Sequence, residues 1–279
     1  MLKVLKSGFY TTIQDLGRFH YRNKGVPVSG VMDHISVHKA NSLLENQESA
    51  SVLEITMTGP TLIFEEDTFI VLAGANMSAT LNNKPIHNYK VYSVDIGDIL
   101  SYGKLENGFR SYLAIKDGFQ IKSVLGSMSF YKPITNENRI KDGDIIPYGP
   151  KKFFQPKISE YKTDSLLEET ILEVFRAPEF DLLNDKQLEA LFANDFTISK
   201  ENNRMAYQIN ESIVGHEISM LTSGTLPGTV QLTPSGKIII LMMDGQTTGG
   251  YPRITQLSDK AISILAQKKE GDTISFKLI

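Results

Sequence analysis

Short apolar, β-branched runs separated by turn-forming residues dominate the first half of the chain. Three of them, at 51–57, 61–64 and 68–72, are divided by Gly59-Pro60 and by a run of three acidic residues. This spacing is typical of antiparallel strands joined by tight turns. Further strands are expected at 90–95, 99–101, 109–115, 171–175 and 237–243. The pattern therefore predicts a mainly β protein.

Three segments carry clear helix signals. N-cap residues are expected at Asp33 and at Asn184, where Gln187 completes a capping box, and a third helix is expected to follow Ser258-Asp259. Apolar residues follow each cap at helical spacing, namely Val37, Ala40 and Leu44, then Leu188, Leu191 and Phe192, then Ile262, Leu265 and Ala266. A few short helices are therefore expected beside the strands.

Two kinds of turn are predicted within the β regions. Asn82-Asn83 can supply the left-handed positions of a tight hairpin. Gly-Asp precedes an apolar strand at 97–98, 143–144 and 271–272, where the glycine can turn left-handed and the aspartate can accept from backbone amides. Each copy alone is compatible with a generic turn. Three copies indicate related β-barrel units repeated along the chain.

A polar, proline-bearing stretch at 149–164 lacks clear periodicity and marks the expected domain boundary. We therefore predict an N-terminal β-barrel region at 1–150, a linker at 151–167 and a C-terminal β-barrel region at 168–279.

Composition argues against several classes of protein. The 279 residues are 41% hydrophobic and 22% charged, with a net charge of −3 and no cysteine. Scattered lysines and arginines argue against nucleic-acid binding, and no apolar run approaches the roughly 20 residues that span a membrane. His34 and His38 are four apart on a predicted helix but lack the further ligands of a metal site. A cytoplasmic protein without metal, membrane or nucleic-acid partners is expected.

The first candidate site is a loop that places Gln14, Asp15, Gly17 and Arg18 within five residues. An amide can both donate to and accept from a substrate amide, and arginine can bind a carboxylate or phosphate with two hydrogen bonds. Asp15 is suited to orienting Arg18 or to acting as a base. The alternative is a solvated turn with a local Asp–Arg pair.

Further polar loops are candidates for ligand contact. The loop at 25–33 includes Ser29 and enters a helix whose free amides can bind an anion, although Asp33 as N-cap would partly neutralise that site. The loop at 244–252 follows an apolar strand, and its paired glycines allow close approach of a ligand. The loop at 223–231 is similar and ends on Gln231. For all three, a purely structural loop is the alternative.

Taken in order, these segments resemble the urea amidolyase-related carboxyltransferase family, and within it the bacterial 5-oxoprolinase C-type subunits. The resemblance covers nearly the whole chain, and its first and last segments are the most specific. It rests on residues 12–18, 25–33, 53–54, 59–60, 74–75, 227–231 and 246–252.

The resemblance implies cyclophilin-like β-barrels in tandem and a reaction in which 5-oxo-L-proline, ATP and water give L-glutamate, ADP and phosphate. It also implies a B-type partner (allophanate hydrolase subunit 1-like) and a further A-type partner. ATP, with Mg²⁺, would be shared with the B-type partner or bound mainly by it, and the chain alone would be inactive. Asp15 and Arg18 are then the catalytic candidates. The substrate-binding candidates are Gln14, Gly17, Ser29, Asp33, Arg204, Gln231, Gln246, Thr247, Thr248, Gly249, Gly250 and Tyr251.

The sequence departs from the family pattern at several arginines. Met128, Gln208 and Gly245 stand where the family commonly has arginine, which removes three potential anion-binding groups. Two alternatives therefore stay open. One is biotin-dependent carboxyl transfer to a urea-like amide, which needs a separate biotin carrier. The other is a non-enzymatic binding protein that antagonises a kinase-inhibitor partner, which the missing arginines favour.

Overall fold

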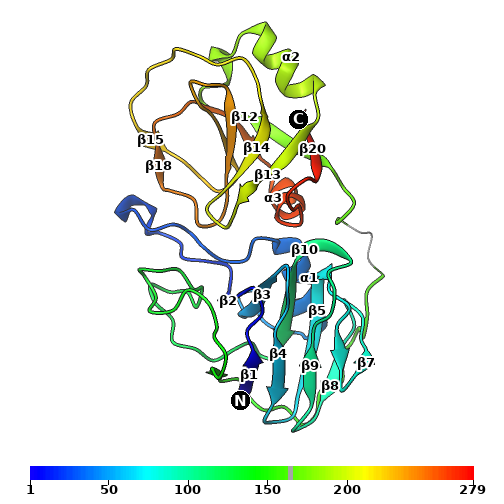
Figure 1. The fold of residues 1–279 in the computed structure, drawn as a ribbon. Coiled ribbons are helices and arrows are strands. Elements are labelled where there is room, and N and C mark those ends of the chain that lie inside the picture. Colours follow the sequence, from blue (N-terminus) through cyan, green and yellow to red (C-terminus); the bar gives the residue numbers. More distant parts are fainter. Residues whose placement is uncertain (163–165) are drawn as a thin grey trace. The chain divides into compact units, whose positions relative to one another are not determined.

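The computed structural model describes residues 1–162 and 166–279, which form two compact units (Figure 1). Unit 1 comprises Met1–Arg18 and Ser29–Leu167, and unit 2 comprises Phe19–Val28 and Glu168–Ile279. A short N-terminal segment therefore belongs with the C-terminal half of the chain. Residues 163–165 of the expected linker lie outside the described residues.

Unit 1 contains two antiparallel sheets and one helix, α1 (His34–Leu43). The six-stranded sheet has the order β11 (Ile145–Ile146), β1 (Leu2–Lys6), β4 (Thr61–Phe64), β9 (Ile99–Ser101), β6 (Thr80–Leu81) and β7 (Lys84–Pro85). The five-stranded sheet has the order β2 (Tyr10–Gln14), β3 (Val52–Thr56), β10 (Asn107–Ile115), β5 (Thr68–Asn76) and β8 (Tyr92–Val94).

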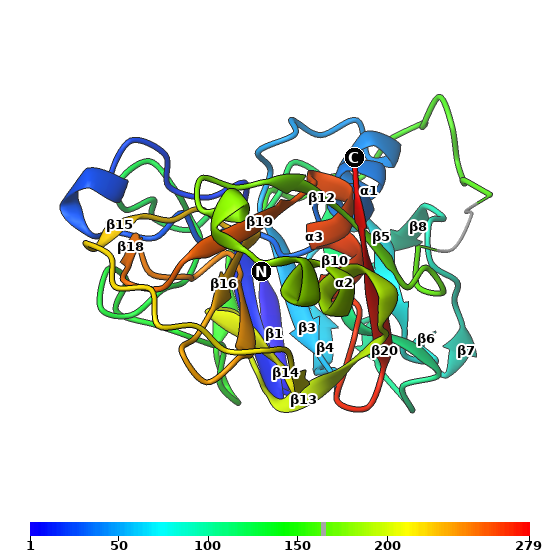
Figure 2. The same cartoon turned by 90° about the horizontal axis from the view of Figure 1, so that it is seen from above.

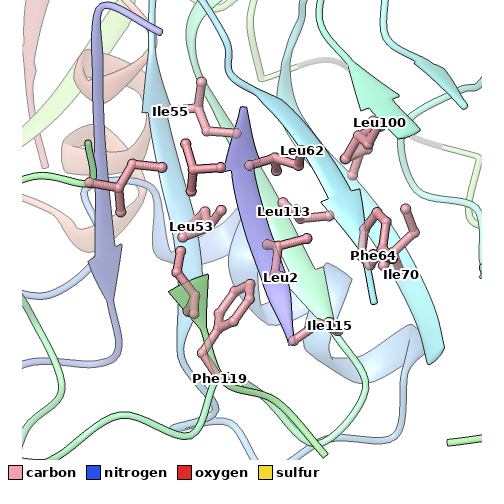
Figure 3. Close-up of a cluster of buried hydrophobic side chains, with 14 of the residues drawn as sticks. Leu2, Leu53, Ile55, Leu62, Phe64, Ile70, Leu100, Leu113, Ile115 and Phe119 are labelled. Carbon is pink, nitrogen blue, oxygen red and sulfur yellow. The ribbon is translucent and has the colours of Figure 1, made fainter. Parts of the chain in front are cut away.

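Alternation along the strands divides the apolar side chains of unit 1 between two cores. In β5, Ile70 and Leu72 enter the first core, whereas Val71 and Ala73 enter the second. The first core joins residues of both sheets, including Leu2, Leu53, Ile55, Leu62, Phe64, Leu100, Leu113 and Ile115 (Figure 3). The second packs α1 against the five-stranded sheet through Val37, Ala40, Leu43, Tyr112 and Ala114. The sheet carrying β2 is thereby covered on both faces.

Unit 2 is a closed seven-stranded barrel with two helices and a small two-stranded sheet. The strand order is β12 (Ile171–Arg176), β19 (Arg253–Leu257), β16 (Thr229–Leu232), β17 (Lys237–Leu241), β14 (Ala206–Ser212), β13 (Phe196–Asn202) and β20 (Thr273–Leu278). The parallel pairing of β20 with β12 closes the barrel. The remaining helical elements are α2 (Asp185–Ala193), α3 (Asp259–Ala266) and the 3-10 turns η1 (Arg22–Lys24) and η2 (Phe180–Leu182). The two-stranded antiparallel sheet consists of β15 (Ser223–Gly224) and β18 (Thr248–Gly249); it is called the β15–β18 hairpin here, although β16 and β17 lie between its strands in the sequence. Figure 2 shows α3 beside β12, which it contacts.

The predicted helix starts are confirmed by their capping hydrogen bonds. The side chains of Asp33, Asn184 and Ser258 accept from the backbone amides of residues 36, 187 and 261 at 2.9, 3.0 and 3.1 Å. In return, Gln187 Oε1 accepts a hydrogen bond from Asn184 N at 3.0 Å, so the predicted capping box is present. Local polar chemistry therefore determines where each helix begins.

The predicted turns are also confirmed. Asn82 and Asn83 have φ of 51° and 62°, and they connect β6 to β7. The three Gly-Asp turns share one geometry, because their glycines have φ of 89°, 86° and 85° and each aspartate Oδ2 accepts from the amide three residues earlier at 2.9, 2.7 and 2.9 Å. The mainly β prediction is confirmed, with a closed barrel in unit 2 and two sheets in unit 1.

Candidate functional site

The loop after β2 in unit 1 is fixed by its own buried side chains. Gln14 is fully buried, and its Oε1 accepts from Gly30 N at 3.1 Å. Its Nε2 donates to Thr12 Oγ1 at 3.0 Å and to Phe130 O at 3.3 Å. The amide therefore uses both of its ends to join segments of unit 1. Contact between Gln14 and a substrate amide stays a prediction.

Both oxygens of the Asp15 carboxylate accept hydrogen bonds. Oδ1 accepts from Gly17 N at 2.8 Å, from Ser127 Oγ at 2.6 Å and from Ser129 Oγ at 2.7 Å. Oδ2 accepts from Met128 N at 2.6 Å. Four donors on one carboxylate anchor the 127–129 loop to the 15–18 loop.

Arg18 fixes the same loop from its other side. Its side chain is fully buried, Nε donates to Val124 O at 3.2 Å, and Nη2 donates to Ser129 O. Asp15 and Arg18 are therefore brought together by binding one loop, and both are buried rather than forming a solvated pair. Their catalytic roles stay predictions.

Ser29 has two features that destabilise the folded state. It has φ of 57°, a conformation that non-glycine residues rarely adopt, and its buried Oγ has no hydrogen-bond partner among the described residues. Gly30 beside it has φ of 87°, and a Cβ there would lie 2.8 Å from Leu16 O. Backbone strain and an unpaired hydroxyl are typical of ligand-contacting positions, so Ser29 stays a binding candidate.

The N-terminus of α1 is capped by the chain itself. Asp33 Oδ1 accepts from Ser36 N at 2.9 Å and Oδ2 accepts from Ser36 Oγ at 2.6 Å. The backbone N of Asp33 donates to Tyr112 Oη at 2.9 Å. The position where an anion was expected is therefore occupied by the Asp33 carboxylate, as its N-cap assignment implied.

A buried charged network beside this cap was missed by the sequence reasoning. Glu54 Oε2 accepts from Met32 N at 2.8 Å and from Tyr112 Oη at 3.1 Å, and Glu54 Oε1 lies 3.9 Å from Arg110 Nε. Burial, together with the negative charges of Glu54 and Asp33, raises the pKa of Tyr112 well above its usual value. The available signal was a charged residue inside each of two apolar strands, β3 and β10.

In unit 2, the two glycine-bearing loops predicted separately form one hairpin. Ser223 pairs with Gly249 and Gly224 with Thr248. The pairing continues where Thr225 N donates to Thr247 O at 3.1 Å and Thr225 Oγ1 donates to Gln246 O at 2.5 Å. The side chains of Gln246, Thr248 and Tyr251 are exposed on this hairpin and its continuation, where they are accessible to a ligand.

Gln231 lies in β16 against this hairpin. Its side chain is fully buried, and Nε2 donates to Tyr251 O at 3.3 Å. Oε1 has no hydrogen-bond partner among the described residues. A Cβ at Gly249 would lie 2.5 Å from Gln231 Nε2, so a larger residue there would have to displace the Gln231 amide or the strand. Gly250 has more room, because a Cβ placed there would have Thr222 Oγ1 as its nearest neighbouring atom, at 3.9 Å.

Arg204 has an internal partner in unit 2. Its Nε and Nη2 donate to Asp244 Oδ2 and Oδ1 at 2.8 and 3.2 Å, and Asp244 N donates to Arg204 O at 2.8 Å. Such a bidentate pair neutralises the guanidinium charge. Arg204 therefore holds the start of the 244–252 loop, and its contact with substrate stays a prediction.

Two further arginines, Arg253 and Arg22, donate to backbone carbonyls in and beside β15. Neither was named as a candidate from the sequence. Arg253 Nη1 donates to Gly224 O at 2.6 Å, while its guanidinium is paired with Glu179 at 2.7 Å through both Nε and Nη2. Arg22 Nη2 donates to the next carbonyl, Thr225 O. No periodicity singles out Arg22, because it lies in a short polar segment far from the hairpin in sequence.

Neither a metal site nor a membrane-spanning helix occurs among residues 1–162 and 166–279. No group of three or more potential metal-ligating side chains is present there. His38 Nδ1 lies 3.5 Å from Glu48 Oε1, with both side chains exposed. No helix in these ranges is long and apolar enough to cross a membrane.

Residues 24–278 match the family model "Carboxyltransferase domain, subdomain A and B". The chain belongs to the carboxyltransferase domain family. It is 32% identical to the 5-oxoprolinase C subunit of Escherichia coli strain K12 over 99% of this chain and 90% of that protein. It is 29% identical to the urea amidolyase of Lachancea kluyveri, over 98% of this chain but 17% of that protein.

Solved structures of family members agree with this assignment. The crystal structure of TTHA0988 aligns with a TM-score of 0.90 and 26% identity, covering 99% of this chain and 55% of that one. The K. lactis urea amidolyase aligns with a TM-score of 0.87 and 27% identity, covering 99% and 18%. The mainly β fold is therefore that of the carboxyltransferase domains.

The three positions where the family commonly has arginine lie in different surroundings in this structure. A Cβ at Gly245 would lie 2.8 Å from Met242 O and 3.1 Å from Leu241 Cβ, so this backbone does not accept an arginine there. Met128 contributes its backbone N to Asp15, a contact that is independent of its side chain. Gln208 lies half-buried in β14.

Proposed function

We propose that this chain is the C-type component of an ATP-dependent 5-oxoprolinase, which converts 5-oxo-L-proline, ATP and water to L-glutamate, ADP and phosphate. The observation that carries the proposal is the 32% identity to a 5-oxoprolinase C subunit over nearly the full length of both chains. A second 5-oxoprolinase C subunit, from Haemophilus influenzae, is 31% identical over 91% of its length. The urea amidolyase relatives match over a much smaller share of their length.

In this reaction we assign the lactam to the present chain. Gln246 and Thr248 offer exposed amide and hydroxyl groups on the β15–β18 hairpin and its continuation, and Gln231 offers a buried amide beneath it. Amide and hydroxyl groups suit the N–H and C=O of a lactam, because each ligand group then meets a complementary donor or acceptor. The hairpin of unit 2 is therefore the part of the chain that we assign to substrate contact.

We assign ATP and its Mg²⁺ mainly to the B-type partner, with the A-type partner completing the complex. A triphosphate requires several cations in reach, whereas Arg204 and Arg253 are paired with carboxylates and Arg18 donates to backbone carbonyls. When bound, ATP supplies the phosphoryl group that activates the lactam carbonyl oxygen. The role of this chain is to bind and orient the lactam.

The test is to reconstitute the full chain with its B-type and A-type partners and to measure ATP-dependent glutamate release from 5-oxoproline. Gln246→Ala is expected to lower kcat/KM, whereas Lys186→Ala, an exposed change on α2, serves as the matched control. A stable complex without turnover would refute the proposal and favour the binding role against a kinase-inhibitor partner. Turnover that requires bicarbonate and a biotinylated carrier would favour carboxyl transfer to a urea-like amide.

A further inference from the structure

Arg22 carries a charge that no carboxylate neutralises among the described residues. It is half-buried in unit 2, Nη2 donates to Thr225 O, and the buried Nη1 has no hydrogen-bond partner. Arg253 holds the adjacent carbonyl of Gly224 but is paired with Glu179. Burial lowers the pKa of Arg22, in keeping with a desolvated guanidinium that has no carboxylate partner. Burying a cation with an unpaired donor raises the free energy of the folded state, and a bound anion would offset that cost by accepting the hydrogen bond.

Gln231 has an unpaired buried acceptor, whereas Arg22 has an unpaired buried donor. Its side chain is fully buried in β16, its Nε2 donor is used by Tyr251 O, and its Oε1 acceptor has no partner among the described residues. An unpaired buried acceptor also has a free-energy cost, which a ligand N–H would remove. Unit 2 therefore holds one unused cationic donor and one unused neutral acceptor.

Both groups contact residues in or beside the same small pair of strands, β15 and β18, which are labelled in Figure 1. Thr225, whose carbonyl Arg22 binds, follows β15 directly. The Cβ position of Gly249 lies 3.3 Å from Thr225 Cγ2 and 2.5 Å from Gln231 Nε2. Arg22 and Gln231 are thus linked through Thr225 and Gly249.

We propose that Arg22 and Gln231 form a recognition pair for a cyclic amide that carries a carboxylate beside its N–H. Gln231 Oε1 accepts from the ligand N–H, and Arg22 Nη1 donates to the ligand carboxylate. Both atoms are buried, so the neighbouring β15–β18 strands move to admit the ligand. The pair makes Arg22 the residue that selects an anionic lactam over a neutral amide such as urea. It rests on the proposed function for the identity of the lactam.

The test compares 5-oxoproline with 2-pyrrolidinone, the same lactam without the carboxylate. Binding to the full chain, alone and in complex with its B-type partner, is measured by calorimetry. Arg22→Gln is expected to weaken 5-oxoproline binding by about 10- to 100-fold and to leave 2-pyrrolidinone binding unchanged, since one charge-assisted contact is lost. Arg22→Lys, which keeps the charge, is expected to retain part of the preference.

Arg253→Gln is the matched control, because it removes an arginine that holds the neighbouring carbonyl of the same hairpin. It is expected to affect both ligands equally. An equal loss for both ligands in Arg22→Gln would overturn the proposal, because it would show that Arg22 only supports the hairpin. Failure of wild-type protein to bind 5-oxoproline, alone and in complex, would also overturn it.

The two proposals fail separately. A complex that binds 5-oxoproline through Arg22 but releases no glutamate retains the recognition pair and refutes the 5-oxoprolinase reaction. A complex that releases glutamate with the same KM in wild type and Arg22→Gln retains the reaction and refutes the recognition pair.

Discussion

The Oδ1 atom of Asp15 accepts a hydrogen bond from Ser127 Oγ at 2.6 Å, although the two residues are 112 positions apart in the sequence. Ser129 Oγ and Met128 N bind the same carboxylate. This acidic side chain, together with Arg18, therefore holds the 127–129 loop in place. This arrangement makes Asp15 a stability residue irrespective of any catalytic role, and its two contributions can be separated experimentally.

Replacing Asp15 with alanine is expected to destabilise unit 1 by about 3 kcal/mol, because buried donors lose a charged acceptor. Urea denaturation followed by circular dichroism measures the change. Asp95→Ala is the control, since that exposed aspartate lies in a turn of the same unit. Unchanged stability in Asp15→Ala would contradict the anchoring role.

Alkaline pH is expected to destabilise unit 1 through Tyr112. Burial first, and then the charges of Glu54 and Asp33, raise the pKa of Tyr112 well above 10.0, and burial raises the pKa of Tyr148 to about 12. Above about pH 10 the unfolded chain loses these protons while the folded chain keeps them, so the free energy of unfolding falls as pH rises. Below pH 10 both states are protonated, and the stabilising contribution is fully present.

The Tyr112→Phe variant is expected to be less stable at neutral pH, because the Asp33 amide loses its acceptor. Its further loss of stability between about pH 9 and pH 11 is expected to be smaller than that of wild type. Denaturant midpoints measured across this range check both statements. An equal alkaline loss in the two proteins would show that Tyr112 ionises normally in the folded state.

Gly249→Ala is expected to disrupt the packing of the β15–β18 hairpin against Gln231, because the new Cβ would lie 2.5 Å from Gln231 Nε2. Hydrogen exchange of the hairpin amides is expected to accelerate. Gly250→Ala is the matched control, since its Cβ would have Thr222 Oγ1 at 3.9 Å as its nearest neighbour. Equal exchange rates in the two variants would mean that the hairpin is not held against Gln231.

Gly97→Ala is expected to cost about 1 kcal/mol of stability, because φ of 89° is strained for any L side chain. Space is not the reason, as a Cβ there meets nothing within 4 Å. Gly224 is equally open but lacks a positive φ, so Gly224→Ala is the control. Thermal unfolding of both variants separates backbone strain from crowding.

Features set by neighbouring residues were predictable from the sequence. The cap at Asn184 and the turn at Gly271 each depend on a hydrogen bond that spans three residues. Their chemistry is complete within one short segment, so composition and spacing specify them. The same reasoning located the two loops that form the β15–β18 hairpin.

Features set by distant pairing were not predictable. The union of Ser223 with Gly249, and the contact of Arg22 with Thr225, join segments that share no local pattern. Strand pairing is determined by packing over the whole unit, which single-strand patterns do not encode. The assignment of Phe19–Val28 to unit 2 is likewise a long-range result. These pairings supply most of the candidate site.

The parallel pairing of β12 with β20 also constrains how the chain is synthesised. β12 ends at Arg176, and β20 begins at Thr273. During translation, β12 emerges with an unpaired edge that stays open until the ribosome has added nearly a hundred further residues. Nascent unit 2 is thus expected to need protection of this edge until β20 is made, and truncation before Thr273 would leave a strand edge available for aggregation.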